Sequence, residues 1–193
     1  NLAGFDTLFR HSQLTSSIDN AEQSLLSNIT TIKLRKNHSV VVDGTKSTIK
    51  LDFGNKLYNP HTDHNKVGGG VITSTGFFES GDTKNYFFDD DGSGNIRKYY
   101  ADNATRVYAD NTVGTVDYGT GVISINTLTY SSTSNTDDSI DFTIVPDSND
   151  VISVRNQLLD ITASEISVTG VADTVASGET SAGVGYTTSS SYS

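Results

Sequence analysis

The chain has 193 residues, and its 13 Lys and Arg against 23 Asp and Glu give a formal net charge of -10 at pH 7. Nucleic-acid binding depends on clustered Lys and Arg that neutralise phosphates, so this acidic balance argues against it. Cysteine is absent, which excludes disulfides, thiolate metal sites and cysteine nucleophiles.

Membrane and secretion signals are also missing from the sequence. A membrane helix needs ~20 apolar residues in a row, and no such run is present. No charged-then-apolar signal segment opens the chain either. We therefore expect no membrane partner. The chain begins at Asn1 and contains no methionine, so we expect it to be a piece of a longer protein.

The first periodic segment, 12–27, predicts a helix. Its apolar residues recur at intervals of four, three and four, which is one face of a helix. Asp19-Asn20 favours a break into two shorter helices, because these side chains prefer caps. The residues that define the face are Leu14, Ile18, Ala21 and Leu25.

After Asn28 the apolar period changes to two, which predicts strands. We expect 31–53 to form strands of one antiparallel sheet, and 151–161 to return to a helix. Glu165–Val171 again has the alternation of a strand. The remaining predicted strands are 71–78, 84–88, 95–100, 104–108, 113–118, 121–129 and 140–144.

One stretch, 113–125, predicts a hairpin with particular clarity. Two β-favouring runs flank Gly119-Thr120-Gly121, and glycine reaches positive φ without a steric clash at Cβ.

Together the segments predict an α+β fold dominated by antiparallel β structure. We expect 1–58 and 130–173 to form a base layer of helix plus sheet. The segment 59–129 is expected to be an inserted, hairpin-rich β lobe, and 174–193 a low-complexity C-terminal tail.

Asp89–Ile96 is the most suggestive candidate for a metal site, because it matches the start of a calcium-binding loop. The twelfth position, however, is Tyr100 instead of the bidentate Glu, and neither flank predicts a helix. A hairpin turn between Phe87-Phe88 and Tyr99-Tyr100 explains the same residues, and we favour it.

A second polar cluster contains His61, Asp63 and His64 beside Pro60. Zinc sites need three or four convergent ligands, and His11 and His38 are the other imidazoles of the chain, so we interpret the cluster as a polar loop.

No sequence pattern marks a catalytic centre. A Gly-x-Ser-x-Gly elbow is missing, and Gly68–Gly70 lacks the Lys-Ser/Thr of a phosphate-binding loop. Acid pairs such as Asp137-Asp138 lie in Ser-rich and Asn-rich loops, where they are typical turn residues. We assign no catalytic, cofactor-binding or metal-binding residue and expect a protein that is not an enzyme.

Three stretches together resemble the C-terminal region of the baseplate wedge-ring subunit of T4-like contractile-tailed phages. They span most of the chain in the same order and spacing. The stretches are Phe5–Thr30, Gly114–Ile123 and Val145–Ile161.

The resemblance implies a structural subunit without enzymatic activity and without a cofactor. It implies that the chain pairs with copies of itself and with other wedge proteins in a ring around the tail tube. The location implied is the baseplate of the virion tail, after assembly in the host cytoplasm.

Two alternatives stay open at this point: a carbohydrate-binding or hydrolysing module of a tail fibre, and a calcium-stabilised adhesive β domain. The aromatic residues that a sugar site would use are Tyr99, Tyr100, Tyr108 and Tyr118.

Overall fold

The computed structural model describes residues 8–22, 25, 27–63, 70–153 and 160–171. The chain divides into two units, Asn1–Leu159 and Asp160–Ser193, and each is described by itself. In chain order the elements are β1 (Leu8–Phe9), α1 (His11–Asp19), β2 (Leu34–Ser39), β3 (Lys46–Asp52), β4 (Ile72–Ser74), β5 (Phe77–Glu79), β6 (Tyr86–Asp90), β7 (Asn95–Asp102), β8 (Thr105–Asp117), β9 (Val122–Thr133), β10 (Ser139–Ile144), β11 (Val151–Ile152) and the 3₁₀ turn η1 (Ala163–Glu165).

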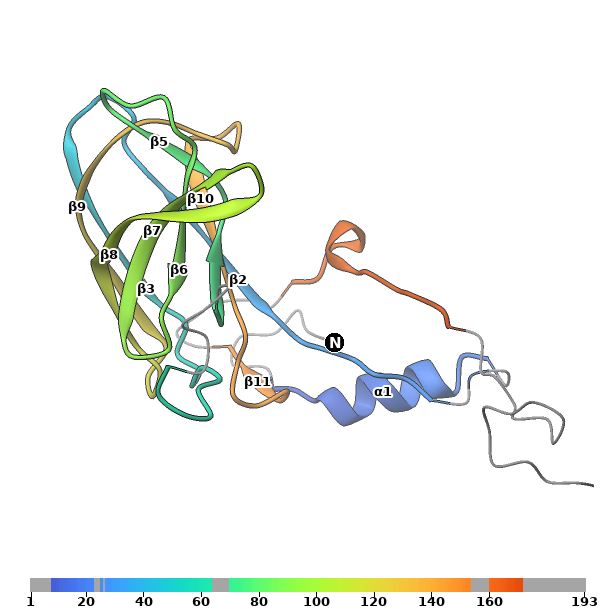
Figure 1. Ribbon diagram of the computed structural model, residues 1–193. Coiled ribbons are helices and arrows are strands. Elements are labelled where there is room, and N and C mark those ends of the chain that lie inside the picture. Colours follow the sequence, from blue (N-terminus) through green and yellow to red (C-terminus); the bar gives the residue numbers. More distant parts are fainter. Residues whose placement is uncertain (1–7, 23–24, 26, 64–69, 154–159, 172–193) are drawn as a thin grey trace, which may run out of the picture. The chain divides into compact units, whose positions relative to one another are not determined.

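Five of these strands close into a barrel (Figure 1). β6 pairs with β7, β7 with β8, and β8 with β9, and the short strand β5 joins β9 back to β6. Every ladder among the described residues is antiparallel. The predicted dominance of antiparallel β structure is therefore confirmed.

Further strands lie outside the closed ring. β4 pairs with β6 and with β10, and β10 pairs with β2. β3 pairs with β9 alone, around an irregularity between Ser47 and Ile49. In the described part of the chain, β2 and β3 thus each pair along one edge. They belong to one sheet, as predicted for 31–53, but β2 pairs with β10 and β3 with β9, and no ladder joins β2 to β3.

The barrel interior is aromatic at its centre. The rings of Phe77 and Phe88 stack with centroids 4.5 Å apart, and Phe142 stacks on Phe88 at 5.7 Å. Tyr130 meets Phe77 edge-on at 5.4 Å. Each of these large side chains is fully buried, so their rings remove apolar area from water on folding.

The predicted hairpin at 113–125 is present as the connection from β8 to β9. Gly121 has φ +74°, as expected for a turn that glycine makes possible, and its N–H donates to the carbonyl of Asp117. Gly114 faces Ile125 across the ladder, and a Cβ there would lie 2.4 Å from the Ser124 carbonyl oxygen. The close approach of two backbones explains this glycine.

Two ladders cross the predicted boundaries of the inserted lobe. β3 pairs with β9, and β4 pairs with β10. The described strands of the predicted base layer and lobe consequently share one sheet. The predicted tail, 174–193, lies outside the described residues.

The helical predictions have different outcomes. α1 covers His11–Asp19 and ends at Asn20, at the break predicted from Asp19-Asn20. It is the one α-helix among the described residues. In the segment 151–161, Val151 and Ile152 form strand β11, paired with β1, while 154–159 lie outside the described residues.

The segment 165–171, predicted as a strand, starts in η1 at Glu165 and lies in no ladder of the described residues, and its side chains are exposed. Periodicity alone cannot supply the second strand that a ladder requires.

Candidate functional site

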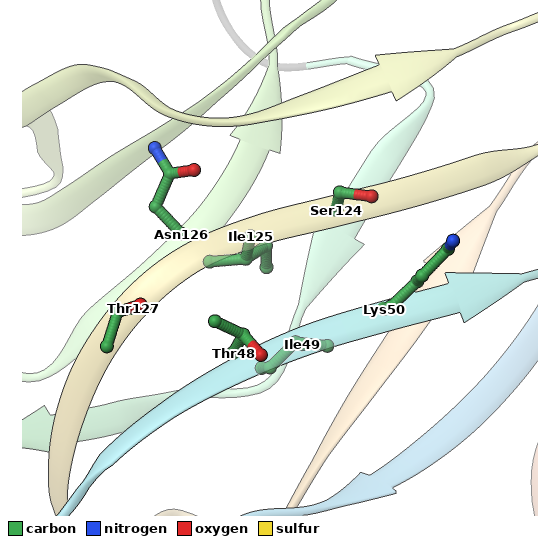
Figure 2. Close-up of a pocket in the computed structure, with 7 residues that line it drawn as sticks. All are labelled: Thr48, Ile49, Lys50, Ser124, Ile125, Asn126 and Thr127. Carbon is green, nitrogen blue, oxygen red and sulfur yellow. The ribbon is translucent and has the colours of Figure 1, made fainter.

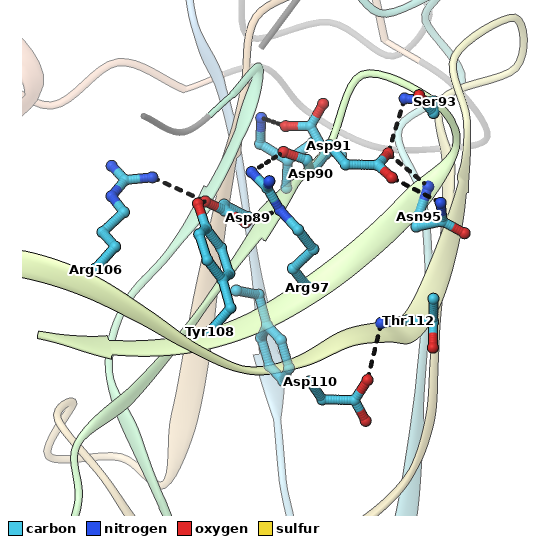
Figure 3. Close-up of polar contacts among 12 residues, drawn as sticks. Asp89, Asp90, Asp91, Ser93, Asn95, Arg97, Arg106, Tyr108, Asp110 and Thr112 are labelled. Carbon is cyan, nitrogen blue, oxygen red and sulfur yellow. Dashed lines mark hydrogen bonds and ion pairs between the residues drawn. The ribbon is translucent and has the colours of Figure 1, made fainter. Parts of the chain in front are cut away.

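The strongest concentration of polar contacts surrounds Asp89 on β6 (Figure 3). One carboxylate oxygen accepts a hydrogen bond from Arg97 Nε at 2.9 Å. The other accepts from Arg106 at 2.8 Å and from the Tyr108 hydroxyl at 3.0 Å. Because Asp89 is fully buried and its neighbours lie on β7 and β8, one carboxylate ties three strands together.

Strand register explains why these residues meet. Asp89 lies directly opposite Arg97 in the β6–β7 ladder, and Tyr99 lies opposite Tyr108 in the β7–β8 ladder. Side chains two residues apart on a strand share a face, so Arg106 joins the same group.

Burial and the neighbouring cations shift the pKa of Asp89 in opposite directions. Burial raises the pKa of Asp89, and the bonds and charge of Arg97 lower it less than burial raises it. Burial also raises the pKa of Tyr108, and the adjacent carboxylate of Asp89 adds to that rise. A buried carboxylate that already accepts three bonds is suited to holding strands together.

The next acid, Asp90, faces the opposite side of β6. Its carboxylate accepts the backbone N–H of Ile72 at 2.8 Å and the Tyr118 hydroxyl at 2.6 Å. Burial, followed by this bond to Asp90, raises the pKa of Tyr118 well above its ordinary value. Asp90 thus links β6 to the start of β4 and to the end of the β8 strand.

Asp91 forms the turn between β6 and β7. It accepts the backbone N–H of Ser93 at 2.7 Å and that of Asn95 at 3.0 Å. Burial alone would raise the pKa of Asp91, but its bonds to Asn95 and Ser93 lower it overall.

The residues of the calcium-loop candidate therefore point to three different places. The hairpin turn predicted between Phe87-Phe88 and Tyr99-Tyr100 is present as the β6–β7 ladder. Tyr100, at the position where a calcium loop needs Glu, packs edge-on against Tyr86 at 5.9 Å. In the described residues no three His, Cys, Asp or Glu side chains come together to hold a metal ion.

The histidines are similarly dispersed. His61 Nδ1 lies 3.0 Å from the carbonyl oxygen of its neighbour Thr62, and His64 lies outside the described residues. His38 sits in β2 opposite Ile140, and burial lowers the pKa of its ring. His11 Nε2 lies 3.0 Å from the Thr30 carbonyl oxygen.

A face of alternating aromatic and arginine side chains lies beside the Asp89 cluster. Phe87 stacks on Tyr99 at 5.6 Å, and Tyr99 lies 5.8 Å from Tyr108. Arg97 lies 4.3 Å from the Tyr108 ring centroid, and Arg106 lies 4.7 Å from that of Tyr99. Of the four tyrosines considered for a sugar site, the structure brings Tyr99 and Tyr108 together, whereas Tyr100 and Tyr118 lie elsewhere.

Another ion pair lies beside the core aromatic cluster. Lys98 Nζ bonds both carboxylate oxygens of Glu79, at 2.8 and 2.9 Å, and lies 4.8 Å from the Tyr86 ring centroid. The buried Tyr130 hydroxyl has no hydrogen-bond partner in the described part of the chain, and burial raises its pKa.

A shallow groove of about 590 Å³ lies along the paired strands β3 and β9 (Figure 2). Thr48, at the irregular pairing between Ser47 and Ile49, is one of its lining residues. Ile49 and Ile125 form its floor, and the polar side chains Thr48, Lys50, Ser124, Asn126 and Thr127 complete its lining. It brings together one cation and several uncharged polar groups, and its lining contains no acid and no imidazole.

Sequence reasoning missed the Asp89–Arg97–Arg106 cluster and the Lys98–Glu79 pair. Opposite charges on successive predicted strands were the available signal, but it identifies partners only once the register is known.

None of the described helices is long and apolar enough to cross a membrane. Comparisons with protein-family models, curated proteins and solved structures find no match to this chain.

Proposed function

We propose that this chain is a structural subunit of a phage tail baseplate, acting by protein-protein contacts and not by catalysis. Its partners in this proposal are copies of itself and other wedge proteins around the tail tube. The three stretches that resemble the wedge-ring subunit suggest this identity.

The observation that carries the assembly proposal is where large apolar side chains remain exposed. Most of them lie before β2 or after β10, outside the barrel, although burying them would be favourable. Those outside it are Leu8, Leu25, Ile29, Ile152, Ile161, Ile166, Val168 and Val171.

α1 adds to this support. None of its nine residues is buried, and no side chain caps its N-terminus. An isolated helix of this length is unstable in water, because its few hydrogen bonds do not offset the free-energy cost of nucleation. It is tethered by a bond from the His11 N–H to Asp150 at 2.9 Å and by the β1–β11 pair. We propose that the predicted base layer of helix plus sheet is completed when another subunit packs on α1.

The test of assembly is sedimentation velocity of the full chain from low to high micromolar concentration. We expect the weight-average sedimentation coefficient to rise with concentration. A strict monomer throughout would contradict self-association.

For the baseplate assignment, antibodies against the chain should label the baseplate end of purified contractile tails, and label confined to fibres would contradict it.

The sugar-binding alternative has one observation in its favour, the adjacent Tyr99 and Tyr108 rings. A guanidinium already lies within cation–π distance of each ring, so a sugar would compete with Arg106 and Arg97 for the aromatic surface. Binding of soluble sugars that is lost in Tyr99→Ala would favour this alternative. We prefer assembly, because the exposed apolar residues are left unexplained by sugar binding.

A further inference from the structure

Two extended runs of the chain leave apolar side chains in water. In the first, Ile29–Arg35, Ile29 is 98% exposed. In the second, Glu165–Val171, Val168 and Val171 are each 87% exposed. Both runs have β-branched residues in alternation, a pattern that favours pairing into a sheet.

The first run ends in an open sheet edge. Its last two residues, Leu34 and Arg35, begin β2 and pair with Ile144 and Thr143 of β10. The opposite edge of β2 carries no ladder among the described residues. Upstream, residues 29–33 belong to no assigned element and continue the alternating exposure. An open edge of this kind presents unpaired backbone N–H and C=O groups to an added strand.

The second run leaves its preceding turn in strand conformation. Thr162 and Glu165 close η1 as a capping box, in which the Glu165 carboxylate accepts the Thr162 N–H at 2.9 Å. Ile166 then has φ -96° and ψ 119°, which is extended. The strand-forming run therefore begins directly after η1, at Ile166.

We propose that Glu165–Val171 of one copy adds antiparallel to Ile29–Arg35 of a second copy. This inference rests on the proposed self-assembly and names the contact that makes it. A second copy is the partner because the proposed assembly requires a contact between copies, and the two runs match each other in sequence. Two chains that exchange these strands form two equivalent contacts, as a twofold interface requires.

One antiparallel register matches the two runs along their whole length. It places Ile166 opposite Leu34, Val168 opposite Ile32, and Val171 opposite Ile29. The same register sets Thr169 opposite Thr31. Opposite residues in antiparallel strands contact one another, so the apolar side chains and the threonines each meet a compatible partner.

Neighbouring registers lose this match. A slip by one residue places Ile166 opposite either Lys33 or Arg35, so an apolar side chain faces a cation. The matched register also covers Ile29 and Val171, two of the most exposed apolar side chains in the described chain.

Cysteine cross-linking tests the register directly, because the chain has no cysteine of its own. Residues 167 and 33 face each other in the proposed pairing. A tagged Ser167→Cys chain is mixed with an untagged Lys33→Cys chain and oxidised. We expect a disulfide-linked heterodimer, and far less with Thr48→Cys on the open strand β3 as the matched acceptor. Equal cross-linking to Thr48→Cys, or a monomeric intrachain disulfide in the double variant, would overturn the proposal.

A second experiment measures association itself. Val168→Asp should raise the dissociation constant of self-association by about tenfold or more, because a charge replaces a valine that the proposed pairing would bury. Val41→Asp, at a half-exposed valine outside both runs, is the matched control and should leave it unchanged. The thermal unfolding of dilute, monomeric protein should be the same in both variants and the parent.

The outcomes separate the two proposals. A parent chain that stays monomeric at every concentration contradicts the proposed self-assembly itself. A parent that associates while Val168→Asp associates equally well keeps the assembly proposal and removes the strand exchange.

Discussion

Buried tyrosines give the chain a defined sensitivity to alkali at the scale of single residues. Burial, reinforced by the hydrogen bond to Asp82 at 2.7 Å, raises the pKa of Tyr86 to about 12. Its ordinary value is 10.0. The folded state therefore holds this proton more tightly than the unfolded state does. The stability that results is complete below pH 10 and is lost as the pH rises towards 12.

We expect the free energy of unfolding to fall across that window, and to fall less in Tyr86→Phe, which has no proton to lose there. Urea unfolding at a series of pH values measures the difference, and tyrosinate absorbance follows ionisation in parallel. Identical pH dependence in the variant and the parent would refute the assignment to Tyr86.

Gly114 is a second residue with a sharp expectation. A Cβ at this position would lie 2.4 Å from the Ser124 carbonyl oxygen and 2.9 Å from the Ile125 Cα. Backbone atoms cannot turn aside as a flexible side chain can. Gly114→Ala should therefore lower the free energy of unfolding by about 1–3 kcal/mol, as measured by urea denaturation. Gly170→Ala meets nothing within 4 Å and serves as the neutral control.

At the scale of elements, the Asp89 cluster decides how β6, β7 and β8 hold together. Asp89→Asn keeps the side-chain shape but leaves Arg97, 6% exposed in its side chain, and Arg106 without their anion. Removing one member of a buried ionic group typically costs about 3–5 kcal/mol, because the remaining charge stays desolvated. We expect a loss of that order in chemical denaturation.

The matched control is Asp110→Asn on β8. Asp110 is exposed and accepts one backbone N–H from Thr112 at 2.8 Å. We expect its replacement to cost less than about 1 kcal/mol, since surface changes have small effects. Equal losses in the two variants would show that the Asp89 cluster contributes no special stability.

At the scale of the whole molecule, a barrel with a buried core contrasts with a segment, 160–171, in which every side chain is exposed. Proteases cut exposed, unpaired backbone first. Glu-C protease should cleave dilute protein after Glu165 before it cleaves at buried barrel acids such as Asp89 and Asp90. Mass spectrometry of the early fragments identifies the site.

Concentration provides the control for this experiment. If the segment pairs with a second copy, cleavage after Glu165 should slow as the protein concentration rises, while cleavage at exposed sites of the barrel does not. Early cleavage inside β6 would instead show that the barrel opens more readily than the exposed segment is cut.

Local chemistry was sufficient for several features of this protein. Alternation of apolar residues identified most strands, because the two faces of a strand meet different surroundings. The glycines after Asp117 predicted the β8–β9 turn, since a left-handed backbone angle is a local requirement that Gly121 meets. The strand-forming pattern of 165–171 is equally plain in the sequence.

Tertiary structure alone decided which strands meet. The sequence predicted a base layer and an inserted lobe, and it did not predict that β3 pairs with β9 or β4 with β10, because ladders join segments by register and not by proximity in the chain. The β6–β7 ladder places Asp89 opposite Arg97. The residues considered for a calcium loop form the turn of this hairpin, next to the buried ionic cluster. For 165–171 the sequence predicted a strand, but the described residues contain no ladder for it. A ladder requires a second strand, which periodicity within one segment does not specify.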